Sequence, residues 1–186
     1  DVYKRQSARS TYPAQFMLVA AMNPCPCGNY GSRITPCRCT AQQIQRYRNR
    51  ISGPMLDRID IHVEMGEVGY NDIAGRSCGE PSSAIRARVN AARAIQTRRY
   101  ADMGILFNAQ LTNRMMNQYC VLTSDAESLM KKAFAALKLS ARAYTRLLKV
   151  SRTIADLAGS EQIKAEHIAE AIQYRSLESK YWGEIK

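Results

Sequence analysis

The chain has 186 residues, of which 46% are hydrophobic, and a formal net charge of +11. It is long enough to bury one core and part of another. No stretch approaches the roughly 20 apolar residues of a membrane span, and the basic amino terminus lacks the apolar region of a signal peptide. We therefore expect a soluble cytoplasmic protein. The charge suggests a polyanionic partner such as nucleic acid, although a basic surface that pairs with an acidic partner segment would look the same.

The first predicted element is a strand, from Phe16 to Met22. This run is continuously apolar, as is typical of a strand buried on both faces of a parallel sheet. Asn23 and Pro24 end it. Ligands gather at the carboxyl ends of such strands, so the Asn23 amide is a candidate for orienting a water or a phosphate oxygen. The alternative is an asparagine that only makes a turn.

Four cysteines follow in two tight pairs, Cys25 with Cys27 and Cys37 with Cys39. Thiolates suit zinc, and two pairs brought together by a hairpin loop can complete a tetrahedral site. Such a site would be structural, because four protein ligands leave no open position. Two alternatives stay open, namely reduced thiols and disulfides, and a cytosolic compartment disfavours the latter.

A helix is predicted next, from Thr40 to about Asn49, since Thr40 and Gln43 have the spacing of a capping box. Apolar and polar residues then alternate from Ile59 to Met65, which predicts a strand at a sheet edge. Arg58 lies directly before this strand. From the residues alone, its simplest partner is Asp57 or Asp60.

Residues 66–80 are rich in Gly, Asn, Asp and Ser without an apolar period, which predicts a linker. A helix from Ser82 to about Arg99 follows, capped by Ser82 and Ser83. Its buried stripe would contain Ile85, Val89, Ala92 and either Ile95 or Gln96. Five arginines surround it, and most of them are expected on a solvated face rather than on phosphates: Arg86, Arg88, Arg93, Arg98 and Arg99.

The remaining chain predicts four more helices. One runs from Thr112 to about Cys120, and another reaches Leu137 from a capping box formed by Ser124 and Glu127. Ser140 caps a third, which ends at Gly159. The last spans Ile163 to Arg175. On the third helix, the spacing of Arg142, Arg146 and Lys149 predicts one basic stripe.

Three stretches resemble the carboxyl-terminal part of the magnesium-chelatase-like ComM/YifB family of AAA+ ATPases. They are PAQFMLVAAMNPCPCGNYGS, CRCTAQQIQRYRNRISGPMLDRIDIHVEM and LSARAYTRLLKVSRTIADLAG. The resemblance covers roughly residues 7–177, with the motifs in family order. It implies a bacterial, ring-forming ATPase, which we expect to be a hexamer that uses ATP and Mg²⁺. Some members are associated with DNA branch migration during DNA uptake and recombination.

The resemblance also implies roles for three residues. Asn23 would position the attacking water, and Arg58 would reach the γ-phosphate bound by the neighbouring subunit. Arg142 matches the second sensor arginine of the lid domain, which contacts the γ-phosphate. The alternative for Arg142 is a surface arginine on an ordinary amphipathic helix.

Two expected features of such an ATPase are missing from the sequence. No stretch supplies the phosphate-binding loop G-x-x-x-x-G-K-[ST], and no strand ending in paired acidic residues precedes Phe16. We therefore expect a fragment that is inactive alone and needs an amino-terminal half as partner. Residues 1–6 do not follow the family pattern and are set aside as a scar.

The predicted fold class is α/β plus all-α. Residues 7–65 would be the last part of the AAA+ core with the cysteine loop, 66–80 the linker, 81–177 the helical lid and 178–186 a tail. Two other functions stay open. One is a chelatase-type subunit whose motor drives magnesium insertion into a porphyrin. The other is a zinc-stabilised module that binds nucleic acid or protein without enzymatic activity.

Overall fold

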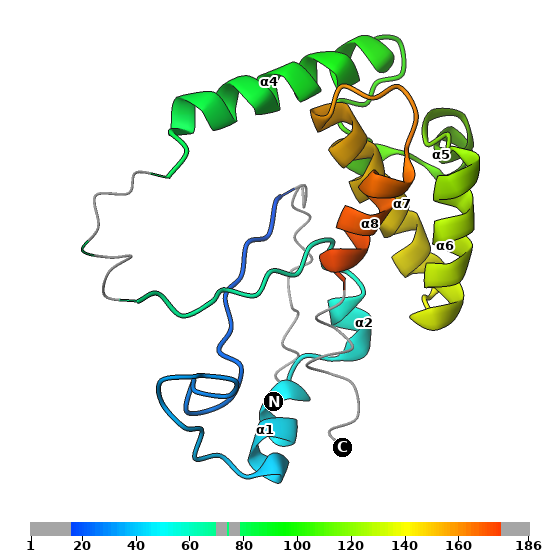
Figure 1. The fold of residues 1–186 in the computed structure, drawn as a ribbon. Helices are drawn as coiled ribbons and strands as arrows, with labels where there is room; N and C mark the ends of the chain where they lie inside the picture. The colour runs from blue at the N-terminus through cyan, green and yellow to red at the C-terminus, as the bar shows by residue number, and fades with distance from the viewer. Residues whose placement is uncertain (1–15, 70–73, 75–78, 176–186) are drawn as a thin grey trace, which may run out of the picture.

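The computed structural model describes residues 16–69, 74 and 79–175, and helices dominate them (Figure 1). A group of helices, α5 to α8, lies at one end, and α1, α2 and the cysteine loop lie at the other. None of the described helices is both long and apolar enough to cross a membrane. The bounds are α1 Ala41–Arg48, α2 Gly53–Leu56, α4 Ser82–Arg99, the 3-10 helix η1 Asn108–Gln110, α5 Asn113–Tyr119, α6 Ser124–Ala136, α7 Ala141–Leu157 and α8 Ala165–Gln173.

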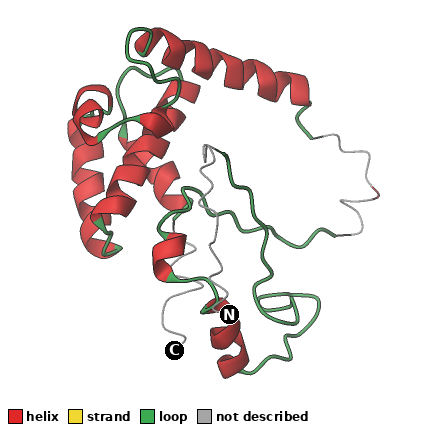
Figure 2. Cartoon of the chain, turned by 180° about the vertical axis from the view of Figure 1, so that it is seen from behind, coloured by secondary structure: helices red, strands yellow, loops and turns green. Residues whose placement is uncertain are grey.

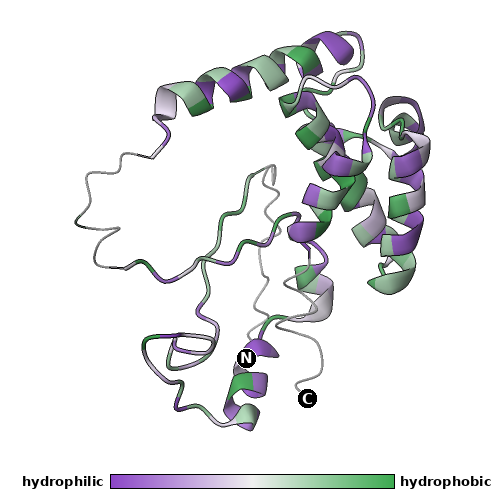
Figure 3. Cartoon of the chain, viewed as in Figure 1, coloured by the Kyte–Doolittle hydropathy of each residue, from purple (hydrophilic) through white to green (hydrophobic). Residues whose placement is uncertain are grey.

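The predicted strand from Phe16 to Met22 is not formed, and the described residues contain no strand (Figure 2). The segment is apolar (Figure 3), yet Phe16 and Met17 are 77% and 88% exposed. A strand is completed by hydrogen bonds to a neighbouring strand, and no described segment pairs with this one. The described residues therefore confirm the helical part of the predicted fold class and do not show its α/β part.

The second predicted strand, Ile59 to Met65, is likewise not assigned as a strand in the described residues. Its apolar residues Ile61, Val63 and Met65 are 49%, 61% and 85% exposed. One backbone bond joins it to the helical group, from the His62 N–H to the Tyr174 carbonyl at 2.9 Å. This bond helps to fix the position of the segment.

The helix ends follow local capping chemistry at most predicted positions. Thr40, Thr112 and Ser140 each accept a backbone N–H in the first turn of α1, α5 and α7, as predicted. Gly159 has a φ of 65° just after α7, where a left-handed residue ends a helix. The prediction for α6 was wrong, because its N-cap is Thr123 rather than Ser124. Glu127 pairs with Lys131 instead of closing a capping box.

The correction at α6 gives a direct test. The Thr123 hydroxyl accepts the Ala126 N–H at 3.4 Å. Thr123→Ala is expected to lower the free energy of unfolding by about 1 kcal/mol, since that N–H loses its acceptor. Ser124→Ala is the matched control and should change it by less than about 0.5 kcal/mol. Urea unfolding of both variants measures the difference, and equal losses would contradict the assignment of the cap.

Only half of the predicted stripe of α4 is buried. Ala92 and Gln96 are buried, but Ile85 and Val89 are 41% and 40% exposed. The reason is the place of the helix, whose amino-terminal half extends beyond the helical group (Figure 1). Burial of an amphipathic stripe needs a packing partner, and the described residues provide one only for the carboxyl-terminal half of α4.

The core of the helical group is built around α7, which packs against α8, α4 and α5, while α6 packs against α8. A parallel bridge between Leu122 and Ile163 joins the segments that precede α6 and α8. Apolar side chains from all these elements meet in one cluster, and burying them removes the apolar face of each helix from water. Its members include Tyr100, Leu111, Met116, Met130, Leu147, Leu148, Ile154, Ile163 and Ile168.

A buried ionic network closes the end of this core. The side chain of Asp156 is fully buried and accepts two hydrogen bonds from Arg99, at 3.0 and 2.6 Å. Arg152, which is 1% exposed, and Asn108 donate to the same carboxylate at 3.1 and 2.8 Å. Every oxygen of the buried carboxylate therefore has donors, which offsets its desolvation.

Removing this carboxylate should strongly destabilise the helical group. Asp156→Ala leaves the buried Arg152 and the partly buried Arg99 without their counter-charge, so we expect a loss of about 3–5 kcal/mol in the free energy of unfolding. The exposed Asp102 is a matched control, and Asp102→Ala should cost less than about 0.5 kcal/mol. Thermal or urea unfolding followed by circular dichroism checks both. Similar losses for the two variants would argue against a structural role for the network.

Candidate metal centre and exposed arginines

The cysteine loop reverses at two glycines. The Gly28 N–H donates to the Cys25 carbonyl at 3.0 Å, and Gly28 and Gly31 have φ values of 83° and 86°. Side-chain-bearing residues rarely adopt this backbone conformation, so the glycines permit the tight reversal. The loop then returns Cys37 and Cys39 towards Cys25 and Cys27.

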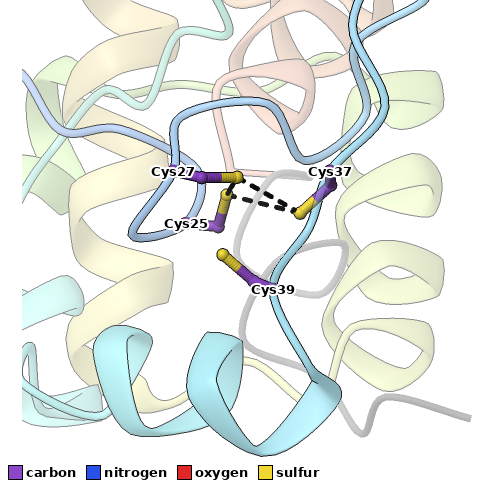
Figure 4. A group of neighbouring side chains, drawn as sticks. All are labelled: Cys25, Cys27, Cys37 and Cys39. Carbon is purple, nitrogen blue, oxygen red and sulfur yellow. Dashed lines mark hydrogen bonds between the residues drawn. The ribbon is translucent and has the colours of Figure 1, made fainter.

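The four sulfur atoms of this loop form one cluster (Figure 4). The Cys25 sulfur lies 3.4 Å from that of Cys27 and 3.7 Å from that of Cys37, and the Cys27 and Cys37 sulfurs are 3.5 Å apart. All four sulfurs, with Cys39 included, lie within 4.8 Å of one another. A tetrahedral zinc site with bonds of about 2.3 Å separates its sulfurs by roughly 3.8 Å. The spacing and the soft donor set therefore fit a metal ion.

The cysteines of the cluster are free thiols rather than disulfides. Their environments favour different protonation states of the thiol. Backbone hydrogen bonds from Asn29 and Arg38 lower the pKa of Cys27 to about 6. Burial raises the pKa of Cys39 to about 12. A metal ion would favour the thiolate at all four positions, because thiolates are its ligands.

Helix α1 is attached directly to the cluster. Cys39 precedes Thr40, whose hydroxyl and backbone form the predicted capping box with Gln43, at 3.2 and 2.9 Å. At the other end of α1, Arg48 is 2% exposed and its Nε donates to the Pro24 carbonyl at 3.3 Å. Its guanidinium also lies 4.6 Å from the centre of the Tyr30 ring. The loop and the helix thus brace each other.

Asn23 lies beside this loop with an exposed side chain. A Cβ atom at Gly28 would lie 3.9 Å from the Asn23 amide nitrogen, in ordinary contact. Asn23 therefore lies next to the same reversal that brings the cysteines together.

Arg58 lies just after α2, with Pro54 in the first turn of that helix. Its guanidinium is exposed and donates to the Pro54 carbonyl at 2.8 Å. The pairing with Asp57 or Asp60 that the residues alone suggested is wrong. Asp57 accepts from Arg175 and from the Ser140 hydroxyl, both at 3.2 Å, and Asp60 pairs with Arg146. The guanidinium is therefore free to meet an anion.

Two of the three residues in the predicted basic stripe of α7 are engaged by other parts of the chain. Arg146 binds Asp60, and the Lys149 ammonium donates to the Ala109 carbonyl at 2.9 Å. Burial lowers the pKa of Lys149, and the nearby Arg146 adds to that shift. Arg142 stays exposed in the first turn of α7. It is the member of the stripe that faces solvent.

The arginines around α4 are also partly engaged within the chain. Arg88 makes a double hydrogen bond to Glu80 at 2.7 and 3.0 Å, and the Arg93 guanidinium lies 4.7 Å from the centre of the Phe107 ring. Arg99 belongs to the buried network, whereas Arg86 and Arg98 are exposed. Apart from Arg99 all of them are exposed, which is in keeping with the expected solvated face of the helix.

Two family models match the chain. The model described as magnesium chelatase, subunit ChlI C-terminal, matches residues 79–175, more than half of the chain, and that described as magnesium chelatase, subunit ChlI, matches residues 2–73. The chain belongs to the magnesium chelatase ChlI family. The resemblance inferred from the motifs is thereby confirmed.

Curated relatives match almost the whole chain. It is 42% identical to the uncharacterized protein YifB of Salmonella typhimurium over 94% of its length. It is also 42% identical to the competence protein ComM of Haemophilus influenzae over 95%, and 33% identical to the uncharacterized protein Mb2921c of Mycobacterium bovis over 92%. The chain spans about a third of the length of these relatives, from 33% to 34%.

In this ChlI-family chain, the structure brings some predicted site residues together. The four cysteines form one cluster with Asn23 beside it, and Arg58 and Arg142 lie in segments joined through the bond from Ser140 to Asp57. Sequence reasoning missed the partners of Asp57 and Asp60. These partners are more than 80 residues away along the chain, so no local spacing could have indicated them.

Proposed function

We propose that this chain is the end of the AAA+ core and the helical lid of a magnesium-dependent ATPase that assembles as a ring, which we take to be a hexamer. Two findings support this division. The family matches change from residue 73 to residue 79, within the predicted linker, and residues 79–175 contain the helical group. The activity belongs to the whole assembly, because an amino-terminal part must supply the phosphate-binding loop.

One observation carries the proposal, namely the state of Arg58. Its guanidinium is exposed and bonded to a carbonyl, while both neighbouring carboxylates are engaged by other residues. An arginine beside two carboxylates commonly forms a charge-assisted hydrogen bond with one of them. Here it keeps its charge available for the γ-phosphate of a neighbouring subunit. A guanidinium in that place stabilises the charge that spreads over the phosphoryl oxygens.

Two more residues complete the proposed site. Arg142, exposed at the start of α7, would bind the phosphates of its own subunit and close the lid. Asn23 would hold the attacking water through its amide. Magnesium, when bound with ATP, would neutralise phosphate charge. We assign no magnesium ligand in this chain, because Asp57 and Asp60 are held by ion pairs.

DNA is the proposed substrate of the motor, in branch migration or recombination during DNA uptake. The net charge of +11 supports a polyanionic partner, and one relative is named a competence protein. The second candidate is a chelatase-type subunit, which the descriptions of the two matching family models favour. In that function the same motor would drive magnesium insertion into a porphyrin.

We further propose that the cysteine cluster binds one structural zinc ion. The support is the meeting of four soft ligands at the spacing of a tetrahedral site. Cys25 is completely buried, and four protein ligands leave no place for a substrate. The zinc would brace the loop beside Asn23 and the start of α1.

The test is ATP turnover after this chain is mixed with a separately expressed amino-terminal segment that carries the phosphate-binding loop. Turnover that requires both parts, and that rises with branched DNA, is the expected result. A rate of ATP turnover that does not change with DNA, but is coupled to insertion of magnesium into a porphyrin, would favour the chelatase function. A complex without turnover would overturn the motor assignment and favour a zinc-stabilised binding module.

A further inference from the structure

The segment that bears Arg58 is fastened to the helical group on both sides of that residue. Before it, the Asp57 carboxylate accepts hydrogen bonds from the Ser140 hydroxyl and from Arg175, both at 3.2 Å. After it, Arg175 donates to the Ile59 carbonyl at 2.9 Å, and Asp60 pairs with Arg146. Arg58 therefore sits between two anchored residues, while its own side chain points to solvent.

The anchors on α7 also flank Arg142. Ser140 is the N-cap of the helix and Arg146 lies one turn after Arg142. Ser140 holds two groups at once, since its hydroxyl donates to Asp57 and accepts the Ala143 N–H at 3.1 Å. A rigid helical turn thus carries Arg142 and, through two acids, the segment of Arg58.

We infer that Asp57 and Asp60 are positioning residues that tie Arg58 to the turn of α7 that carries Arg142. This rests on the proposed function, in which Arg142 contacts the nucleotide of its own subunit and Arg58 that of the neighbour. When nucleotide binding moves α7, the two acids move Arg58 with it. Each subunit then presents its arginine to its neighbour according to its own nucleotide state.

The two acids are placed for different tasks. Asp57, whose side chain is 26% exposed, faces Arg175, whose side chain is 3% exposed, so this contact is the better shielded of the two and suits a permanent attachment. The pair of Asp60 with Arg146 is open, with side chains 56% and 26% exposed. Exposed pairs are weak and can be broken during a movement. Asp60 is therefore the position at which coupling can be removed while the chain stays folded.

The first experiment uses the chain by itself. Hydrogen exchange of the backbone amides of residues 57–62 is compared between the wild type, Asp60→Arg, Arg146→Asp and the double exchange Asp60→Arg with Arg146→Asp. We expect each single variant to exchange about tenfold faster and the double variant to return to within about threefold of the wild type. The exposed pair of Glu127 and Lys131 on α6 is the matched control, so Glu127→Arg should have no effect in this segment. Unchanged exchange in both single variants would overturn the attachment.

The second experiment tests coupling in the mixture with the amino-terminal segment. A non-hydrolysable ATP analogue should change exchange both at the start of α7 and at residues 57–62. In Asp60→Arg only the change at α7 should persist, and the maximal turnover should fall about tenfold with the affinity for ATP kept within about twofold. The double exchange should restore both. A nucleotide-dependent change at residues 57–62 that persists in Asp60→Arg would overturn the inference.

The two proposals fail in distinguishable ways. If Arg58→Ala leaves turnover intact, the trans role of Arg58 is wrong, whatever the behaviour of Asp60. If Arg58→Ala abolishes turnover but Asp60→Arg keeps wild-type turnover and coupling, the role of Arg58 stands and the positioning by the acids does not.

Discussion

Replacing Arg58 by alanine is expected to lower the maximal ATP turnover of the assembled ring by about a thousandfold. Its exposed guanidinium donates to the Pro54 carbonyl and contributes little to the folded chain, so the variant should fold normally. The loss should fall on the maximal rate, because the charge that Arg58 would stabilise in the proposed role develops in the transition state. Steady-state kinetics with the amino-terminal segment present measure it. Arg46→Ala, at another exposed arginine, on α1, is the matched control and should leave the rate within about twofold.

Mixed rings test whether this arginine acts across the subunit interface. Arg58→Ala chains are combined with chains whose partner segment lacks its phosphate-binding lysine. Each kind is inactive by itself, but a ring of both places an intact Arg58 next to an intact phosphate-binding loop. In a random equal mixture, about a quarter of the interfaces should combine an intact Arg58 with an intact phosphate-binding loop. We therefore expect about a quarter of the wild-type turnover. If the mixture stays inactive although rings form, the arginine does not act on the neighbouring subunit.

The second large effect concerns the cysteine cluster. The chain is expected to bind one zinc ion, and Cys37→Ser combined with Cys39→Ser should abolish that binding. An apparent binding free energy on the order of 10 kcal/mol is typical of such sites, so the loss should unfold the loop and the start of α1. Elemental analysis gives the zinc content. Hydrogen exchange at residues 25–48 gives the structural effect, and residues 124–173 should be unaffected.

Cys120 provides the control for this experiment. It is a free cysteine in the helical core, where burial raises its pKa to about 11, and it is not part of the cluster. Cys120→Ala should therefore keep full zinc content, even if it lowers the free energy of unfolding slightly. Cobalt is a useful second probe, because thiolate ligands give it a visible absorption. No zinc uptake by the wild type under reducing conditions would leave the cluster as four free thiols.

The helices could be predicted because their signals are local. Thr40, Thr112 and Ser140 each cap a helix from within one turn, and Gly159 ends one by its own backbone preference. The cysteine cluster was predictable for a similar reason, since a short loop separates its two pairs. At α6, two neighbouring hydroxyl residues competed for one cap, and spacing alone favoured the wrong one.

The failed predictions depend on distant partners. The run from Phe16 to Met22 has the composition of a strand, but a strand needs a neighbour that the described residues do not supply. The stripe of α4 fails at Ile85 and Val89 for the same reason. The engagement of Asp57 and Asp60 was missed because charge pairing over such sequence separations leaves no periodic pattern. Sequence therefore located Arg58 but not what surrounds it.

The shape of α4 adds a mechanical consequence. A helix of 18 residues is about 27 Å long, and only its carboxyl-terminal half packs on the helical group. The helix therefore extends as a rigid rod from the helical group, with its attached end near Tyr100. A rotation of the helical group by about 10° would carry Ser82 through an arc of roughly 5 Å. Small rotations of α7 would thus displace the amino-terminal end of α4 by distances comparable to an atomic contact.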